Sequence, residues 1–186
     1  TYAGLGHGKW PQRWLLSKKR GDVAYTAYMG KILLHVGAIL FFVVLSQSAG
    51  GLGSVFTISS VETWYQFLSK PPLTPPDWIF GPVWGVLYTL MGIATYIIWR
   101  SKHPKRWRAI GLFIVHLIVN TAWSIIYFGE QSILGGLVTI VLLDILIIWI
   151  IVRYRNISKA AAYLLVPYLA WVLFATYLNA GILLLN

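Results

Sequence analysis

Aromatic and polar side chains recur every three or four residues in three apolar stretches of the chain. These residues are Trp84, Tyr88, Met91 and Thr95; His116, Asn120, Trp123 and Tyr127; and Tyr168, Trp171, Ala175 and Asn179. In a helix, this spacing places each set on one face. Three such faces could line a flat slot for a large planar ring, because ligand pockets are mostly apolar with a few polar groups. From the residues alone, however, ordinary core packing is the favoured explanation.

Few other side chains in these stretches could do chemistry. A neutral imidazole can coordinate the metal of a haem or chlorophyll, which makes His116 a candidate ligand, with hydrogen-bonded packing as the alternative. Asn120 and Asn179 should either bond to another helix or face a cavity, because an unpaired amide is costly in a membrane. The chain has no cysteine, and no nucleophile, acid–base pair or metal cluster is visible in it. We therefore expect no catalytic residues and no metal site.

Asp144 is the only acidic residue well inside an apolar stretch. A carboxylate in the middle of a membrane helix costs about 2.5–3.5 kcal/mol. We therefore expect Asp144 to face the interior of a helix bundle or a subunit interface.

The composition predicts an all-α membrane protein. Of 186 residues, 58% are hydrophobic and 11% are charged, and the mean hydropathy is +0.71, whereas soluble domains carry about 25% charged residues. Five apolar runs approach or exceed the roughly 20 residues that a helix needs to cross a bilayer. The runs are Ile32–Phe56, Ile79–Trp99, Ile110–Phe128, Ile133–Val152 and Ala160–Leu185. Short connections between them predict a compact bundle of five transmembrane helices.

The fifteen Lys and Arg residues alternate between the connections. Six precede or open the first run, five separate the second and third, three separate the fourth and fifth, and only Lys70 follows the first. The positive-inside rule then places the N-terminus in the cytoplasm and the C-terminus outside. This placement explains the net charge of +10 without a nucleic-acid partner.

Residues 1–30 and residues 31–186 form two predicted parts. The first part holds tryptophans and a basic Lys18-Lys19-Arg20 run but no apolar stretch of signal-peptide type. We expect it to be an interfacial arm on anionic lipid headgroups, with docking to a partner protein as the alternative. The second part is the transmembrane domain.

The connection from Thr57 to Trp78 is the longest one expected outside the membrane. It contains Trp64, Trp78 and four prolines, and prolines reduce the conformational freedom of a loop. We expect it to fold over the end of the bundle as a lid, whereas an aromatic belt at the headgroups is the alternative.

Three blocks of sequence resemble the translocator protein family, also called TspO/MBR. The first block runs from Trp64 to Trp84 and contains Lys70-Pro71-Pro72-Leu73-Thr74-Pro75-Pro76-Asp77-Trp78. The second contains Asn120, Trp123-Ser124 and Phe128-Gly129, and the third contains Pro167-Tyr168-Leu169-Ala170-Trp171 and Leu178-Asn179. The blocks occur in order and fall on the expected helices.

The resemblance implies a five-helix bundle around a ligand cavity, closed by the loop after the first helix, and commonly a homodimer. It implies a porphyrin-type ligand, with Trp84 and Trp171 at the porphyrin site. The sites expected to contact the ligand are Trp64, Trp78, Trp84, Tyr88, His116, Asn120, Trp123, Trp171 and Asn179. The expected ligand is a porphyrin, haem, chlorophyll-type tetrapyrrole or other hydrophobic small molecule, and no cofactor is required.

The chain departs from the family pattern at three places. His116 stands where members often carry Gln, and Asp144 lies five residues after the usual place of the fourth-helix acid, near Thr139. No Lys or Arg follows Lys159, so the proposed cholesterol pattern, which needs a basic residue soon after a tyrosine, cannot be completed. A role in sterol transport is therefore disfavoured.

The sequence leaves three functions open. We favour a tetrapyrrole receptor or sensor, placed in a bacterial inner membrane. The alternatives are an accessory subunit of a larger membrane complex, such as a pigment–protein complex, and an enzyme that degrades porphyrin in light.

Overall fold

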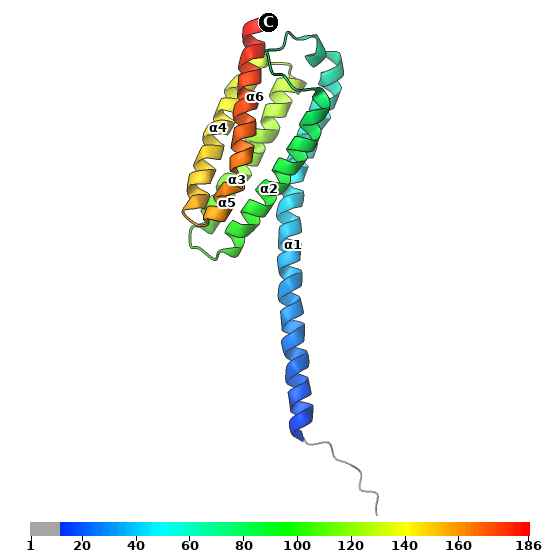
Figure 1. Cartoon of the computed structure of the whole chain (residues 1–186), viewed down its shortest axis with the longest axis vertical. Helices are drawn as coiled ribbons and strands as arrows, with labels where there is room; N and C mark the ends of the chain where they lie inside the picture. The colour runs from blue at the N-terminus through cyan, green and yellow to red at the C-terminus, as the bar shows by residue number, and fades with distance from the viewer. Residues whose placement is uncertain (1–11) are drawn as a thin grey trace, which may run out of the picture. The chain divides into compact units, whose positions relative to one another are not determined.

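The computed structural model describes the backbone of residues 12–186 and the side chains of Lys19 and of residues 22–186. The regular elements of the described chain are all helices, and the described chain contains no strand. Its helices are α1 (Gln12–Thr63), α2 (Phe80–Arg100), α3 (Arg106–Ser124), α4 (Ile133–Arg155), α5 (Lys159–Tyr163) and α6 (Val166–Leu185), as Figure 1 shows. Two short 3₁₀ helices, η1 (Tyr65–Phe67) and η2 (Asp77–Ile79), lie between α1 and α2, and a π-helical turn, η3 (Ile125–Gly129), ends α3.

Among the described residues, five segments are long and apolar enough to cross a membrane. They are Asp22–Thr63, Asp77–Arg100, Arg106–Gly129, Ile133–Arg155 and Lys159–Leu185. The predicted all-α architecture with five transmembrane helices is therefore confirmed. The orientation of the termini stays a prediction.

The chain divides into two compact units, one ending at Ala38 and one covering Ile39–Asn186. The predicted interfacial arm belongs to the first unit. Its first eleven residues lie outside the described part, and from Gln12 onward it is helical as the beginning of α1. Its contact with lipid headgroups stays a prediction.

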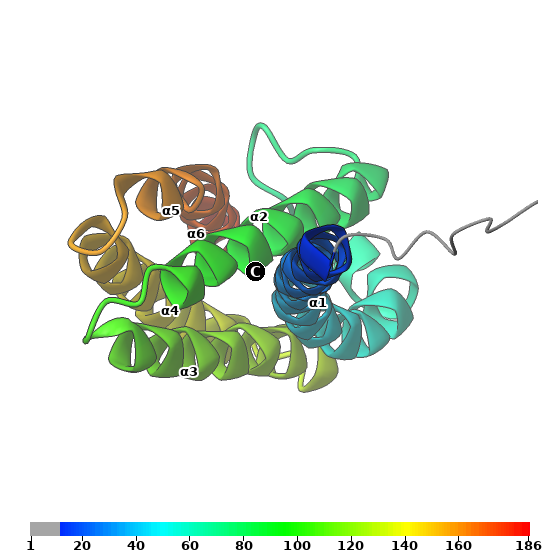
Figure 2. The same cartoon turned by 90° about the horizontal axis from the view of Figure 1, so that it is seen from below.

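In the second unit, the end of α1 and the four long helices α2, α3, α4 and α6 form a closed ring (Figure 2). Helix α4 packs against α3 and α6, and α2 packs against α3 and α6. The end of α1 lies between α2 and α3: Gln47 donates to the Gly85 carbonyl of α2 at 2.8 Å, and Thr121 of α3 donates to the Ala49 carbonyl at 3.2 Å. The five helices thus surround a common interior.

The last apolar run is broken into two helices at Leu164 and Leu165. Pro167 lies in the first turn of α6, where its missing N–H is tolerated but where it could not continue a preceding helix. The predicted single span therefore consists of α5 and α6.

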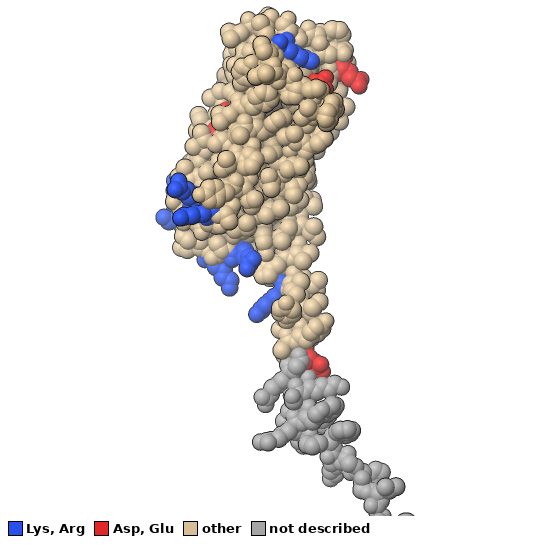
Figure 3. All heavy atoms as spheres, viewed as in Figure 1, with Lys and Arg blue, Asp and Glu red and all other residues tan. Residues whose placement is uncertain are grey.

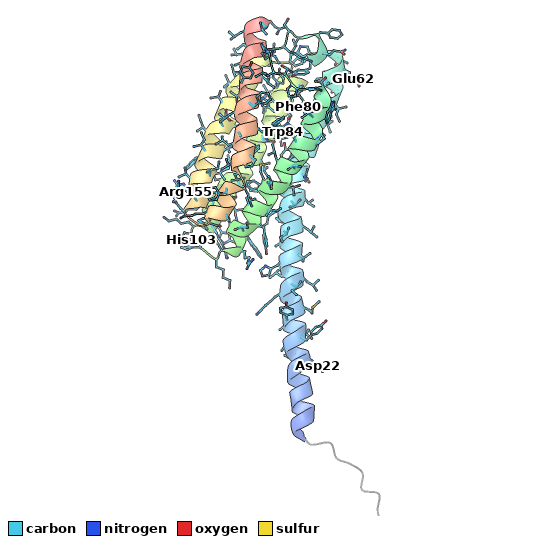
Figure 4. All side chains as sticks on the ribbon, viewed as in Figure 1. Asp22, Glu62, Phe80, Trp84, His103 and Arg155 are labelled. Atoms are coloured by element: carbon cyan, nitrogen blue, oxygen red, sulfur yellow. The ribbon has the colours of Figure 1, made fainter. Side chains whose placement is uncertain are left out.

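Most basic side chains of the second unit lie at one end of the bundle, and three of its four acidic residues lie at the other, Asp144 in the middle of α4 being the exception (Figure 3). Eight of the nine Lys and Arg residues after Ala38 lie around the α2–α3 and α4–α5 connections: Arg100, Lys102, Lys105, Arg106, Arg108, Arg153, Arg155 and Lys159. Lys70 lies at the other end together with Glu62, Asp77 and Glu130. In Figure 4, the acidic Glu62 is labelled near one end of the bundle and the basic Arg155 near the other.

Candidate functional site: an aromatic cavity in the bundle

The second unit contains a half-open cavity of about 560 Å³. Its walls come from α1, α2, α3, η3 and α6 and from the loop between α1 and α2. Seven aromatic side chains line it, and we call them the aromatic wall: Tyr65, Phe80, Trp84, Tyr88, Trp123, Tyr127 and Phe128. Pockets for small organic ligands commonly measure about 300–1,000 Å³ and are mostly apolar. The size and the lining therefore suit a large hydrophobic ligand.

Several rings of the aromatic wall lie nearly parallel. Trp84 stacks on Tyr88 with 5.4 Å between ring centroids and 27° between planes, and Trp84 and Trp123 are 6.4 Å apart at 32°. Trp123 and Tyr127 stack at 5.6 Å and 8°. Neighbouring rings that share an orientation offer flat surfaces on which another aromatic ring can stack.

Tyr127 and Phe128 owe their positions to η3. The Glu130 N–H donates to the Ile125 carbonyl at 2.8 Å, which is the wider spacing of a π turn. Such turns occur frequently at functional sites. Here both Tyr127 and Phe128 are buried and both reach the cavity.

A hydrogen-bond network holds the aromatic wall from behind. The Tyr88 hydroxyl donates to Asn120 Oδ1 at 2.5 Å, and Asn120 Nδ2 donates to the Tyr168 hydroxyl at 3.1 Å. The same hydroxyl lies 2.7 Å from His116 Nε2. Because the network joins α2, α3 and α6, it fixes the ring of Tyr88 at the cavity surface.

The sequence-predicted residues fall into two groups. Trp84, Tyr88, Trp123 and Asn179 line the cavity. His116 and Asn120, which are 1% and 2% exposed, lie in the network behind the wall. The structure therefore places His116 outside the cavity lining, with Nε2 already hydrogen-bonded to Tyr168, so the geometry provides no fit for coordination of a metal in the cavity.

The three other predicted tryptophans are not part of the lining. Trp171 packs against Phe80 of the aromatic wall at 5.9 Å, and Trp64 packs edge-on against Tyr127 at 5.6 Å. Trp78 is 75% exposed. Trp64 and Trp171 thus pack against lining residues, whereas Trp78 is not brought together with the other predicted site residues.

The loop between α1 and α2 is attached to α6. The Ser69 N–H donates to Asn186 Oδ1 at 3.0 Å, and Asn186 Nδ2 donates back to the Ser69 carbonyl at 3.0 Å. The Tyr177 hydroxyl donates to the Pro72 carbonyl at 2.9 Å. Because this loop also supplies Tyr65 to the aromatic wall, its attachment to α6 closes one side of the site.

Tyr65 is the loop residue most buried in the site. The residue is 6% exposed, and the Lys70 ammonium lies over its ring, 4.3 Å from the ring centroid. Burial, reinforced by the nearby Asp77 carboxylate, raises the pKa of Tyr65 to about 12. The hydroxyl is therefore neutral across the physiological pH range.

Sequence reasoning missed the part of the cavity that α1 builds. Gln47, Gly50, Ser54 and Thr57 line it, although none carries an aromatic signal. A Cβ at Gly50 would collide with the Tyr88 ring. The run of small residues was the available signal, because it lets α1 approach the aromatic rings of α2 closely.

Asp144 contributes to packing between α4 and α6. It is 7% exposed, and Thr176 Oγ1 donates to its Oδ2 at 2.8 Å. It faces the bundle interior, one of the two predicted locations, but it does not line the cavity.

Comparison with known proteins identifies the family. Residues 40–185 match the model of the TspO/MBR family. The chain is 46% identical to the tryptophan-rich protein TspO of Archaeoglobus fulgidus over 83% of this chain and 98% of that protein. It is 44% identical to the tryptophan-rich protein TspO of Chlorobaculum tepidum over 76% of this chain and 91% of that protein. It is 38% identical to the human translocator protein over 69% of this chain and 78% of that protein. The five membrane-spanning segments, the aromatic cavity and these matches together show that the chain belongs to the TspO/MBR family.

Proposed function

We propose that this integral membrane protein is a receptor that binds a porphyrin-type tetrapyrrole in the aromatic cavity. The observation that carries the proposal is the row of neighbouring rings Tyr88, Trp84, Trp123 and Tyr127, in which Tyr88 stacks on Trp84 and Trp123 stacks on Tyr127. A tetrapyrrole is a flat, polarizable ring system, and offset stacking on aromatic side chains adds about 0.5–1.5 kcal/mol per pair beyond the burial of apolar area.

The surroundings of the rings favour a preformed site. The network through Asn120 and Tyr168 holds Tyr88 in place, so little side-chain freedom is lost when a ligand binds. Ordering of side chains is one of the main costs of binding. A fixed wall therefore supports recognition of a rigid macrocycle.

Titration with protoporphyrin IX tests this function. Purified protein in detergent should give a saturable shift of the porphyrin Soret band together with quenching of tryptophan fluorescence. Trp84→Leu removes the ring that stacks on Tyr88 and lies next to Trp123, and we expect it to weaken binding about tenfold or more. Trp149→Leu is the matched control, because Trp149 lies on α4 outside the lining and is 47% exposed.

Two outcomes would contradict the proposal. One is a Soret shift that rises linearly with porphyrin and never saturates, as partition into the micelle would give. The other is an equal loss of binding in Trp84→Leu and Trp149→Leu.

We further propose that the receptor works as a homodimer or within a larger membrane complex, as the family resemblance implies. Mass measurement of the protein extracted gently from its native membrane tests this proposal. A monomer with no partner and no bound pigment would count against it.

A further inference from the structure

The aromatic cavity is open on one side. The lining residues that are exposed all belong to α1 or to the η2–α2 segment: Gly51, Ser54, Ile58, Glu62, Asp77 and Gly81. The lining residues from α3, η3 and α6 are buried, apart from the half-buried Ser124. The opening of the cavity therefore lies between α1 and the beginning of α2.

The opening is elongated along the helices. Its residues on α1 follow one another at intervals of three or four, which places them on one face of that helix. From Glu62 to Gly51 the face runs about 16 Å along the helix axis, and Ile58, between them, is 70% exposed. On the other side of the opening, Asp77 and Gly81 are one helical turn apart.

Most of the opening lies within the membrane-spanning segments Asp22–Thr63 and Asp77–Arg100. Its two carboxylates, Glu62 and Asp77, mark the headgroup level, because a charge deeper in the bilayer is costly. In Figure 4, Glu62 of α1 and Phe80 of α2 are labelled toward the same end of the bundle. A face that reaches about 16 Å below the headgroups covers about half of a hydrocarbon layer about 30 Å thick. The opening therefore faces the acyl chains of the leaflet at the acidic end.

Small residues form the edges of the opening. Nothing lies within 4 Å of a Cβ added at Gly51 or at Gly81, so no neighbouring side chain fills the space there. The Ser54 hydroxyl donates to the Gly51 carbonyl at 2.8 Å, and the backbone on both sides is helical. Since polar groups bonded within their own helix are tolerated in hydrocarbon, the opening is compatible with contact to lipid.

The two ends of the opening are closed. At the deep end, Gln47 Nε2 of α1 donates to Thr89 Oγ1 of α2 at 3.0 Å. At the loop end, Pro71 is buried against α6, where a Cβ at Gly181 would lie 2.6 Å from Pro71 Cβ. Among the described residues, the side between α1 and α2 is therefore the way into the cavity that needs no helix or loop to move.

We propose that this opening is a lateral entrance through which the ligand passes directly between the hydrocarbon of the bilayer and the cavity. The inference rests on the proposed function and adds to it the source of the ligand, which is a lipophilic molecule dissolved in the leaflet at the acidic end. Apolar rings favour hydrocarbon over water, so a ligand that takes this route never has to cross water.

A phospholipid in which a porphyrin ring replaces the end of one acyl chain tests the source of the ligand. This conjugate stays in the bilayer, so its ring can reach the cavity only from the lipid. In phosphatidylcholine vesicles, the wild-type protein should give the conjugate a saturable Soret shift, and Trp84→Leu should weaken that binding. Binding of free protoporphyrin IX without binding of the conjugate would overturn the lateral entrance and leave the receptor function intact.

Two substitutions test the position of the entrance. Gly51→Leu and Gly81→Leu each add a bulky apolar side chain at its edge. Each should slow both association and dissociation of protoporphyrin IX about tenfold, because a narrower passage hinders movement in both directions. Gly111→Leu is the matched control, because Gly111 is an exposed helical glycine with nothing within 4 Å of an added Cβ, and it lies outside the lining.

Stopped-flow quenching of tryptophan fluorescence gives the association rate in vesicles, and displacement by an excess of zinc protoporphyrin IX gives the dissociation rate. The bonds between Asn186 and Ser69 stay intact in these variants, because release of the loop exposes a second way into the cavity. The direction of the change in dissociation is the decisive reading. An obstructed entrance slows dissociation, whereas lost contacts with the bound ligand accelerate it.

Faster dissociation in both variants, or rates equal to those of Gly111→Leu, would overturn the lateral entrance. The conjugate experiment uses the wild type, so it decides the inference even where a leucine variant fails to fold. Absence of saturable binding of both free protoporphyrin IX and the conjugate to the wild type would overturn the receptor function, and the inference with it.

Discussion

Asn186 and Ser69 are joined by two hydrogen bonds of 3.0 Å, one in each direction between the Asn186 side chain and the Ser69 backbone. They connect the end of α6 to the loop that carries Tyr65 into the cavity. Asn186→Ala removes both bonds, so we expect the loop to open more often. Amide hydrogen exchange of residues 64–76 should accelerate about tenfold, and porphyrin association and dissociation should both become faster.

Asn156→Ala is the control for this prediction. Asn156 is exposed at the end of α4, far along the chain from the loop. Loop exchange that stays at the wild-type rate in Asn186→Ala would show that Tyr177 and the prolines hold the loop without Asn186.

The contact between α1 and α2 depends on Gly92. A Cβ at this position would lie 2.6 Å from Val43 Cα and 2.7 Å from Val43 N, and backbone cannot give way as a side-chain end can. Gly92→Ala should therefore destabilise the protein by about 1–3 kcal/mol. Thermal unfolding in detergent measures this as a lower melting temperature.

Gly111→Ala is the matched control, because it makes the same substitution in another helix where the added Cβ has room. Gly111 is exposed on α3, and nothing lies within 4 Å of an added Cβ. Since alanine favours a helix over glycine by about 1 kcal/mol, this variant should be as stable as the wild type or slightly more so. If both variants lose stability equally, close approach of the helices is not the cause.

The membrane spans could be predicted from the sequence, but their ends could not. The segment from Thr57 to Thr63 has the composition of a loop, yet it is helical. Thr57 Oγ1 donates to the Gly53 carbonyl at 3.2 Å, and Thr63 Oγ1 to the Ser59 carbonyl at 2.8 Å. Both hydroxyls are satisfied by carbonyls of the preceding turn, so these polar residues are compatible with a helix, and composition does not reveal this.

The candidate site was predictable only in part. The spacing of residues along a helix determines which face they share, but it does not determine which of them reach the cavity. His116, Asn120, Trp123 and Tyr127 share one stripe of α3 and η3, yet only the last two reach the cavity. The difference arises because Tyr168 of α6 pairs with His116 and Asn120. Such a pairing depends on how two helices meet, which no single helix encodes.

Ionisation of Tyr65 is expected to lower the stability of the folded protein at alkaline pH. Its folded pKa of about 12 exceeds the ordinary value of 10.0, and the protonated form is the neutral one. The stabilisation is fully present below pH 10 and is lost as the pH rises from about 10 to about 12. The melting temperature of the wild type should therefore fall more steeply in this window than that of Tyr65→Phe.

Tyr163→Phe provides the comparison for the alkaline experiment. Tyr163 is 70% exposed, so its removal should leave the steep wild-type slope in place. Equal slopes in wild type and Tyr65→Phe would mean that ionisation of Tyr65 is not linked to unfolding.

The separation of charge predicts which end of the bundle faces the cytoplasm. Eight Lys and Arg residues surround the α2–α3 and α4–α5 connections, whereas Lys70 is the only one at the other end of residues 39–186. Because the chain contains no cysteine, Ser69→Cys and Asn156→Cys each introduce a unique thiol at an exposed position. By the positive-inside rule, a membrane-impermeant maleimide should label Ser69→Cys in intact cells and Asn156→Cys only after permeabilisation. The reverse pattern would place the basic end outside and would require another force, such as a bound partner, to hold it there.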